Sequence, residues 1–137
     1  MKLLKKVNVN TYSCHVHFII TDDIHKVENA LYKKHGGDKP DGSPAEGYTV
    51  TVHAGLYVMV LDYKYLTHNL IGHEIYHVTH RIANDRDIRD EESMAWICGF
   101  LSEQFYTWLN TDKVKAECDK LLTKLEKQYG GESTESI

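Results

Sequence analysis

The sequence predicts an α+β protein in which a short three-stranded sheet precedes a group of helices. Two observations predict it: strand-like patterns over residues 12–20 and 48–61, and apolar residues at helical spacing from residue 68 onward. A chain of 137 residues with 42% hydrophobic side chains can build its own core. We expect one domain over residues 1–129 and a disordered tail, GGESTESI, over residues 130–137.

The first strand and the first helix follow from two different periodicities. Apolar residues alternate over residues 12–20, as in a strand with one buried face. Thr21 or Asp22 then offers an N-cap to a helix of about four turns, which stops at Gly36-Gly37. Residues 36–47 hold four of the nine glycines and both prolines, which predicts a loop.

The other two strands form a predicted β-hairpin. Its arms are YTVTV (residues 48–52) and LYVMVL (residues 56–61), joined through Ala54-Gly55. The second arm is apolar on both faces, as in a strand that is covered on two sides. We therefore expect this arm to lie inside the sheet.

Three helices are predicted after the hairpin. The first contains the histidine-rich segment HNLIGHEIYHVTH (residues 68–80). A polar connection, NDRDIRD, precedes a helix from about Glu91 to Leu109, and another runs from about Asp112 to Gln128. The fold class is thus a strand, a helix and a hairpin, followed by the histidine helix and two further helices.

Charge and composition exclude two classes of function. Sixteen basic and twenty acidic residues give a net charge of −4, and the basic residues are scattered, so we expect no nucleic-acid partner. No apolar run approaches the length of a transmembrane helix, and the N-terminal segment is too polar for a signal peptide. The three cysteines are odd in number and have no CxxC spacing, which is typical of reduced thiols rather than of disulfides or a cysteine zinc site. We therefore expect a cytoplasmic protein without a membrane partner.

The histidine-rich helix has two distinct faces. Ile71, Ile75, Val78 and Ile82 fall within one narrow stripe, and His73, His77 and His80 lie on nearly the opposite side. Between Leu70 and Thr79 the only side chain charged by default is Glu74. Because surface helices carry more charge than this, we expect the histidine face to be covered as well.

The spacing of His73, Glu74 and His77 is that of a metal site. Two histidines four residues apart lie one above the other, so both imidazoles can bind one Zn²⁺ at about 2.0 to 2.1 Å. Glu74 is rotated by about 100° around the helix axis, from where it can reach a metal-bound water without binding the metal. Such a metal lowers the pKa of its water and polarises a carbonyl, while the glutamate takes the proton. We expect one zinc ion per chain.

The sequence offers several candidates for the third zinc ligand. His80 lies about 10 Å along the axis from His73, so we interpret it as an exposed residue or one that supports a ligand. Glu92 is preferred, because Ala95 and Gly99 on its face would let the two helices approach closely. The alternatives on or near the connection remain Glu91, Asp85, Asp87 and Asp90.

The motif pair HExxH and ExxA resembles that of the gluzincin branch of the zincin metallopeptidases. The similarity covers roughly residues 48–105 and is closest to small prokaryotic and phage-type zincins with a thermolysin-like catalytic core. It implies that His73, His77 and Glu92 are zinc ligands and that Glu74 is the general base. One departure is Thr79, where zincins usually have an apolar residue.

Two hypotheses about function follow. The first is a zinc-dependent peptidase acting on a peptide or protein substrate, with the hairpin as an edge along which an extended peptide can lie. The second is a binding or assembly protein of zincin shape, with a structural metal or none. It arises because no Tyr or His that stabilises the tetrahedral intermediate can be identified in the sequence. The oligomeric state is not encoded in any recognisable pattern.

Overall fold

A computed structural model describes residues 2–129, without the side chains of residues 121, 122, 124–126, 128 and 129. The predicted tail, residues 130–137, lies outside the described residues. The elements follow in this order: β1 (Lys2–Val9), β2 (Cys14–Thr21), α1 (Ile24–His35), β3 (Gly47–His53), β4 (Leu56–Asp62), α2 (His68–Asp85), α3 (Glu91–Leu109) and α4 (Asp112–Tyr129). The class is α+β, as predicted, but the sheet has four strands.

The strand that the sequence did not predict is β1. It pairs antiparallel with β2 over eight residues, and only Val7 and Val9 are buried. Lysines at positions 2, 5 and 6 point to a polar segment rather than a strand. Such lysines are typical of an edge strand, because charge opposes pairing with another chain. The three-stranded sheet was therefore wrong by one edge strand.

The sheet is mixed and has the order β1-β2-β4-β3. The predicted hairpin is confirmed, since β3 pairs antiparallel with β4. The two central strands, β2 and β4, are parallel and are connected through α1 and β3. The prediction that the second hairpin arm lies inside the sheet is also confirmed, since residues 57–61 are all buried. The free edge of β3 has no strand beside it among the described residues.

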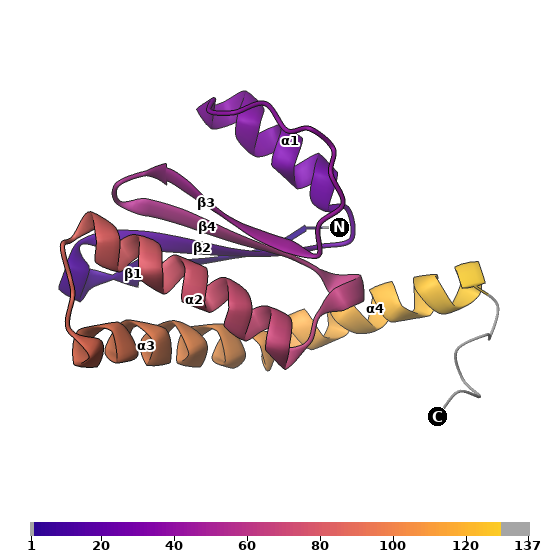
Figure 1. Ribbon diagram of the computed structural model, residues 1–137. Coiled ribbons are helices and arrows are strands. Elements are labelled where there is room, and N and C mark those ends of the chain that lie inside the picture. Colours follow the sequence, from indigo (N-terminus) through magenta and orange to yellow (C-terminus); the bar gives the residue numbers. More distant parts are fainter. Residues whose placement is uncertain (1, 130–137) are drawn as a thin grey trace.

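Helices cover both faces of the sheet (Figure 1). On one face, α2 and α3 pack against β1, β2 and β4 and form the larger core, which includes Phe18, Tyr57 and Phe105. On the other face, α1 covers a smaller cluster through Ile24 and Val27. In Figure 1, α4 extends from the end of α3 past the sheet. None of the described helices is long and apolar enough to cross a membrane.

Candidate metal centre

The α2 helix is fixed at its start and along one face. The Thr67 hydroxyl accepts a hydrogen bond from the Leu70 N–H at 3.1 Å, which caps the N-terminus. The predicted apolar stripe is confirmed, because each of its members is at most 2% exposed: Ile71, Ile75, Val78 and Ile82. Burial of this stripe sets the rotation of the helix and directs His73 and His77 away from the core.

The histidine face is not covered, which corrects one expectation. His73, His77 and His80 are all exposed, and so is Tyr76, at 57%. The His80 ring stacks on the Tyr76 ring, with centroids 6.1 Å apart. The scarcity of charge on this helix therefore does not reflect a second buried face. Because this face is exposed, the imidazoles of His73 and His77 are accessible to a ligand.

The described residues contain one group of three side chains that could hold a metal, namely His73, Glu74 and His77. Their candidate ligand atoms all lie within 4.8 Å of one another. The two imidazole Nε2 atoms are 3.1 Å apart. Two nitrogens at 2.0 to 2.1 Å from a tetrahedral zinc ion would be separated by about 3.3 to 3.4 Å. The imidazole pair therefore fits one zinc ion with an adjustment of a few tenths of an ångström.

Glu74 differs from the two histidines because it is only 4% exposed. The Thr49 hydroxyl, on β3, donates a hydrogen bond to Glu74 Oε1 at 2.9 Å. The other carboxylate oxygen, Oε2, lies 3.8 Å from His73 Nε2. One oxygen is thus held by the sheet, and the other faces the imidazole pair. This arrangement suits a carboxylate that accepts a proton beside a metal rather than one that binds the metal.

Two clefts adjoin these residues. The smaller has a volume of about 290 Å³ and is lined by the start of β3 and the first turns of α2, including Glu46, Asn69, His73 and Glu74. The larger has a volume of about 580 Å³ and lies between α1, the connection after α1 and β3. Thr49 lines the larger cleft and bonds to Glu74 in the smaller. The candidate base therefore lines the smaller cleft and is hydrogen-bonded to a residue of the larger one.

Glu46 and Thr49 are the site residues that the sequence analysis missed. Glu46 lines the same cleft as His73 and Glu74, and its backbone carbonyl accepts a hydrogen bond from the Asp62 N–H at 2.9 Å. Neither residue belongs to a recognisable motif. The position of Thr49 on the polar face of a predicted strand was the only available signal.

Glu92 is not part of the group of three. It is exposed in the first turn of α3. A short connection joins this turn to the end of α2, and His77 precedes that end by eight residues, or about 12 Å along the axis. Glu92 as a ligand stays a prediction, since its carboxylate is not among the candidate ligand atoms that lie within 4.8 Å of one another.

The expected close packing through Ala95 and Gly99 is wrong. Both residues are exposed, and a Cβ atom added at Gly99 would meet no atom within 4 Å apart from its own helix backbone. The α3 helix instead packs through Ile97, Leu101 and Phe105, which are buried. The small residues therefore lie on the solvent side of α3.

The acids that were considered as alternatives have other surroundings. Asp85 accepts a hydrogen bond from the Tyr57 hydroxyl, Asp87 pairs with Arg89, Asp90 caps α3 by accepting from the Ser93 N–H, and Glu91 is exposed. Three of these four acids thus have a partner outside the candidate centre. The Thr79 hydroxyl, at the position that departs from the zincin pattern, donates to the Ile75 carbonyl at 2.9 Å. This bond lets a polar side chain occupy a buried position.

Comparisons of the chain with models of known protein families, with curated proteins and with solved structures gave no match.

Proposed function

We propose that the protein is a zinc-dependent peptidase of the gluzincin type. The proposal rests on one observation. The Nε2 atoms of His73 and His77 lie 3.1 Å apart beside the buried Glu74, and the three residues follow in HExxH order. Two imidazole nitrogens supply two of the three protein ligands of a His₂Glu catalytic zinc site, and Glu74 stands beside them as the base. His73 and His77 would hold the ion, and by resemblance Glu92 would complete the ligands.

In this proposal Glu74 carries out the proton transfers. A zinc ion at this site would polarise a peptide carbonyl and lower the pKa of a bound water to about 7. Glu74 takes the proton of the attacking water on Oε2, the oxygen that faces the imidazoles. It then delivers the proton to the nitrogen of the leaving amine. The hydrogen bond from Thr49 to Oε1 keeps the carboxylate in one orientation during both transfers.

An extended peptide could reach these residues along the free edge of β3. Strand addition uses the unpaired backbone groups of an edge strand, and β3 lies beside both Glu74 and the larger cleft. This position supports a peptide or protein as the substrate class.

The proposal is tested by zinc content and by release of fluorescent fragments from fluorescein-labelled casein. We expect one zinc ion per wild-type chain and none in His77→Ala. Glu74→Gln should keep the zinc and lose about 10² to 10⁴-fold in turnover, because the general base is gone. Equal turnover in Glu74→Gln and wild type would remove the catalytic assignment. Equal zinc content in His77→Ala and wild type would remove the metal centre.

The same zinc measurement tests Glu92. Glu92→Gln should weaken zinc binding, because a neutral amide is a poor replacement for a carboxylate on zinc, and Glu91→Gln is the matched control in the same turn. Unchanged affinity in Glu92→Gln would place the third ligand elsewhere. Glu46, the additional acid in the smaller cleft, would then be the next candidate.

A binding or assembly protein is the second candidate function. The observation that favours it is the lining of the smaller cleft, in which the described residues include no tyrosine and no histidine other than His73. Such a protein would bind a partner without cleaving it. Glu74→Gln would then change neither its zinc content nor its affinity for the partner.

A further inference from the structure

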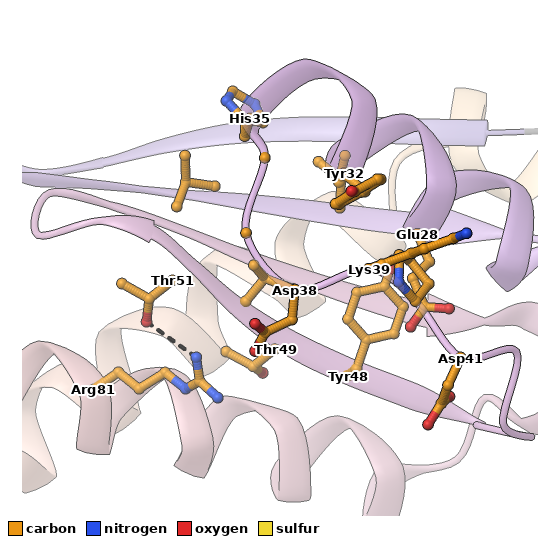
Figure 2. A pocket seen from close by; sticks show the side chains of 16 residues that line it. Glu28, Tyr32, His35, Asp38, Lys39, Asp41, Tyr48, Thr49, Thr51 and Arg81 are labelled. Carbon is orange, nitrogen blue, oxygen red and sulfur yellow. Dashed lines mark hydrogen bonds between the residues drawn. The ribbon is translucent and has the colours of Figure 1, made fainter.

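Two threonines on one face of β3 hold two side chains of α2. Thr49 donates to Glu74, and Thr51 accepts a hydrogen bond from Arg81 Nη1 at 3.0 Å. Thr49 and Thr51 are two residues apart, so their side chains point to the same face of the strand. Figure 2 shows the Arg81 side chain reaching from α2 toward Thr51. The strand edge is therefore flanked by a carboxylate at one point and a guanidinium at another.

Arg81 carries a positive charge that no carboxylate neutralises within the described part of the chain. Its hydrogen bond is to a neutral hydroxyl, and no carboxylate oxygen of the described side chains lies within 4.0 Å of its nitrogens. The side chain is half-buried and lines the larger cleft. A guanidinium has five N–H donors in a planar fork that matches the two oxygens of a carboxylate. One of these donors is used in the hydrogen bond to Thr51, and the side chain that carries the others lines the cleft.

The acids of this cleft are placed on other elements. On α1, Glu28 Oε1 lies 3.6 Å from His25 Nδ1. On the connection, Asp41 accepts a hydrogen bond from the Ser43 N–H. Asp38 also lines the cleft from the connection. These groups would repel a bound carboxylate, whereas two cations that line the cleft would attract it, Arg81 on α2 and Lys39 on the connection. Of these two, Arg81 is the one that is hydrogen-bonded to β3, so it marks the position of a carboxylate beside that strand.

The separation of Arg81 from Glu74 sets the register of such a ligand. Seven helical residues correspond to about 10 Å along α2, and the step from Thr49 to Thr51 corresponds to about 7 Å along β3. An extended peptide advances by about 3.3 Å per residue. Arg81 is therefore two to three peptide residues away from a bond placed at Glu74.

We propose that the larger cleft is a binding site for an extended peptide, in which Arg81 recognises a carboxylate. The peptide pairs with the free edge of β3, and its carboxylate lies two to three residues from the bond beside Glu74. That carboxylate is either an Asp or Glu side chain or the C-terminus of the peptide. The register rests on the proposed peptidase function, whereas the binding site does not.

The proposal is tested by fluorescence anisotropy with zinc-loaded Glu74→Gln protein, which keeps bound peptides intact. The probes are fluorescein-labelled degenerate hexapeptide pools that contain either Glu or Gln at one fixed position. Two further pools, without acidic side chains, end in a carboxylate or in an amide. We expect one carboxylate pool to bind on the order of tenfold more tightly than its neutral counterpart, as for a charged hydrogen-bonded contact.

The preference should disappear in Arg81→Gln and persist in Arg89→Gln, which alters an exposed arginine near the same end of α2. Melting temperatures show whether Arg81→Gln remains folded, and Arg81→Lys should retain part of the preference. The fixed-position pools and the C-terminal pools distinguish the two sources of the carboxylate. Equal binding of all matched pools, or an unchanged preference in Arg81→Gln, would overturn the proposal.

Cleavage of the same pools by the wild-type chain separates this proposal from the peptidase. Cuts two to three residues from the carboxylate support both. An Arg81-dependent preference without any cleavage would refute the peptidase and leave the binding site in place. Cleavage without a carboxylate preference would support the peptidase and overturn the role of Arg81.

Discussion

At the scale of single residues, the orientation of Glu74 depends on a strand rather than on its own helix. Its carboxylate is buried, and the hydrogen bond to Oε1 comes from Thr49, twenty-five residues earlier. A buried carboxylate that lost this donor would be free to rotate or to draw in water. Thr49 is therefore a positioning residue for the proposed base.

Removal of the Thr49 hydroxyl gives the first residue-scale prediction. Thr49→Val keeps the shape of the side chain and should reduce turnover by on the order of tenfold, the value of one hydrogen bond to a charged group. Zinc content and KM should stay near wild type, because the threonine touches neither the imidazoles nor the proposed peptide backbone through its hydroxyl. Steady-state kinetics and zinc analysis check this. Thr49→Ser, which keeps the hydroxyl, should restore turnover, and a Ser variant as slow as Val would contradict the explanation.

At the scale of elements, α3 is held at its start by a carboxylate. Asp90 accepts a hydrogen bond from the Ser93 N–H at 2.8 Å and is the N-cap of the helix. Hydrogen bonds from the Ser93 side chain and backbone lower the pKa of Asp90 below its ordinary value. Because the folded-state pKa is lowered, the stabilisation is present above the unfolded pKa of about 3.9 and is lost as the pH falls through the folded value.

This cap predicts a pH-dependent difference between wild type and Asp90→Asn. Asparagine can still cap the helix but carries no charge toward its N-terminus. Wild type should be the more stable protein at pH 7, and its advantage should shrink as the pH falls below about 4. Urea unfolding between pH 7 and pH 2.5 measures this difference. An advantage that stays constant over that range would show that ionised Asp90 does not stabilise α3.

At the scale of the whole molecule, zinc should act as a stabilising ligand. A metal that binds only the folded chain raises its stability by about 2.7 kcal/mol when its free concentration is 100 times Kd. The imidazoles of His73 and His77 converge only when α2 is formed, so the unfolded chain should bind zinc more weakly. Stability and metal content are therefore coupled.

Chelation tests this coupling. Addition of EDTA to the zinc-loaded protein should lower its melting temperature by several degrees, and added zinc should restore it. His73→Ala should show no response to either reagent. Differential scanning calorimetry at fixed protein concentration makes the comparison. The same response to EDTA in His73→Ala and wild type would show that the stabilising metal binds elsewhere.

The sequence by itself determined most elements of the fold. The predicted helix from Glu91 to Leu109 has the bounds of α3, and the predicted hairpin arms differ from β3 and β4 by one residue at their ends. Local signals carry this information, because caps and apolar periodicity act over a few residues. The same local spacing placed His73, Glu74 and His77 together, since a helix fixes the relation of residues one turn apart.

Only the tertiary structure decided what surrounds those residues. The partners of Glu74 and Arg81 are Thr49 and Thr51, which lie on a strand twenty-five and thirty residues away in the sequence. The parallel pairing of β2 with β4 is equally non-local. At Gly99 the local pattern predicted a contact that the structure does not contain. A small residue permits close helix packing but does not require it, and Gly99 is exposed. Contacts between distant segments depend on how apolar faces fit together across the whole core, which no local pattern specifies.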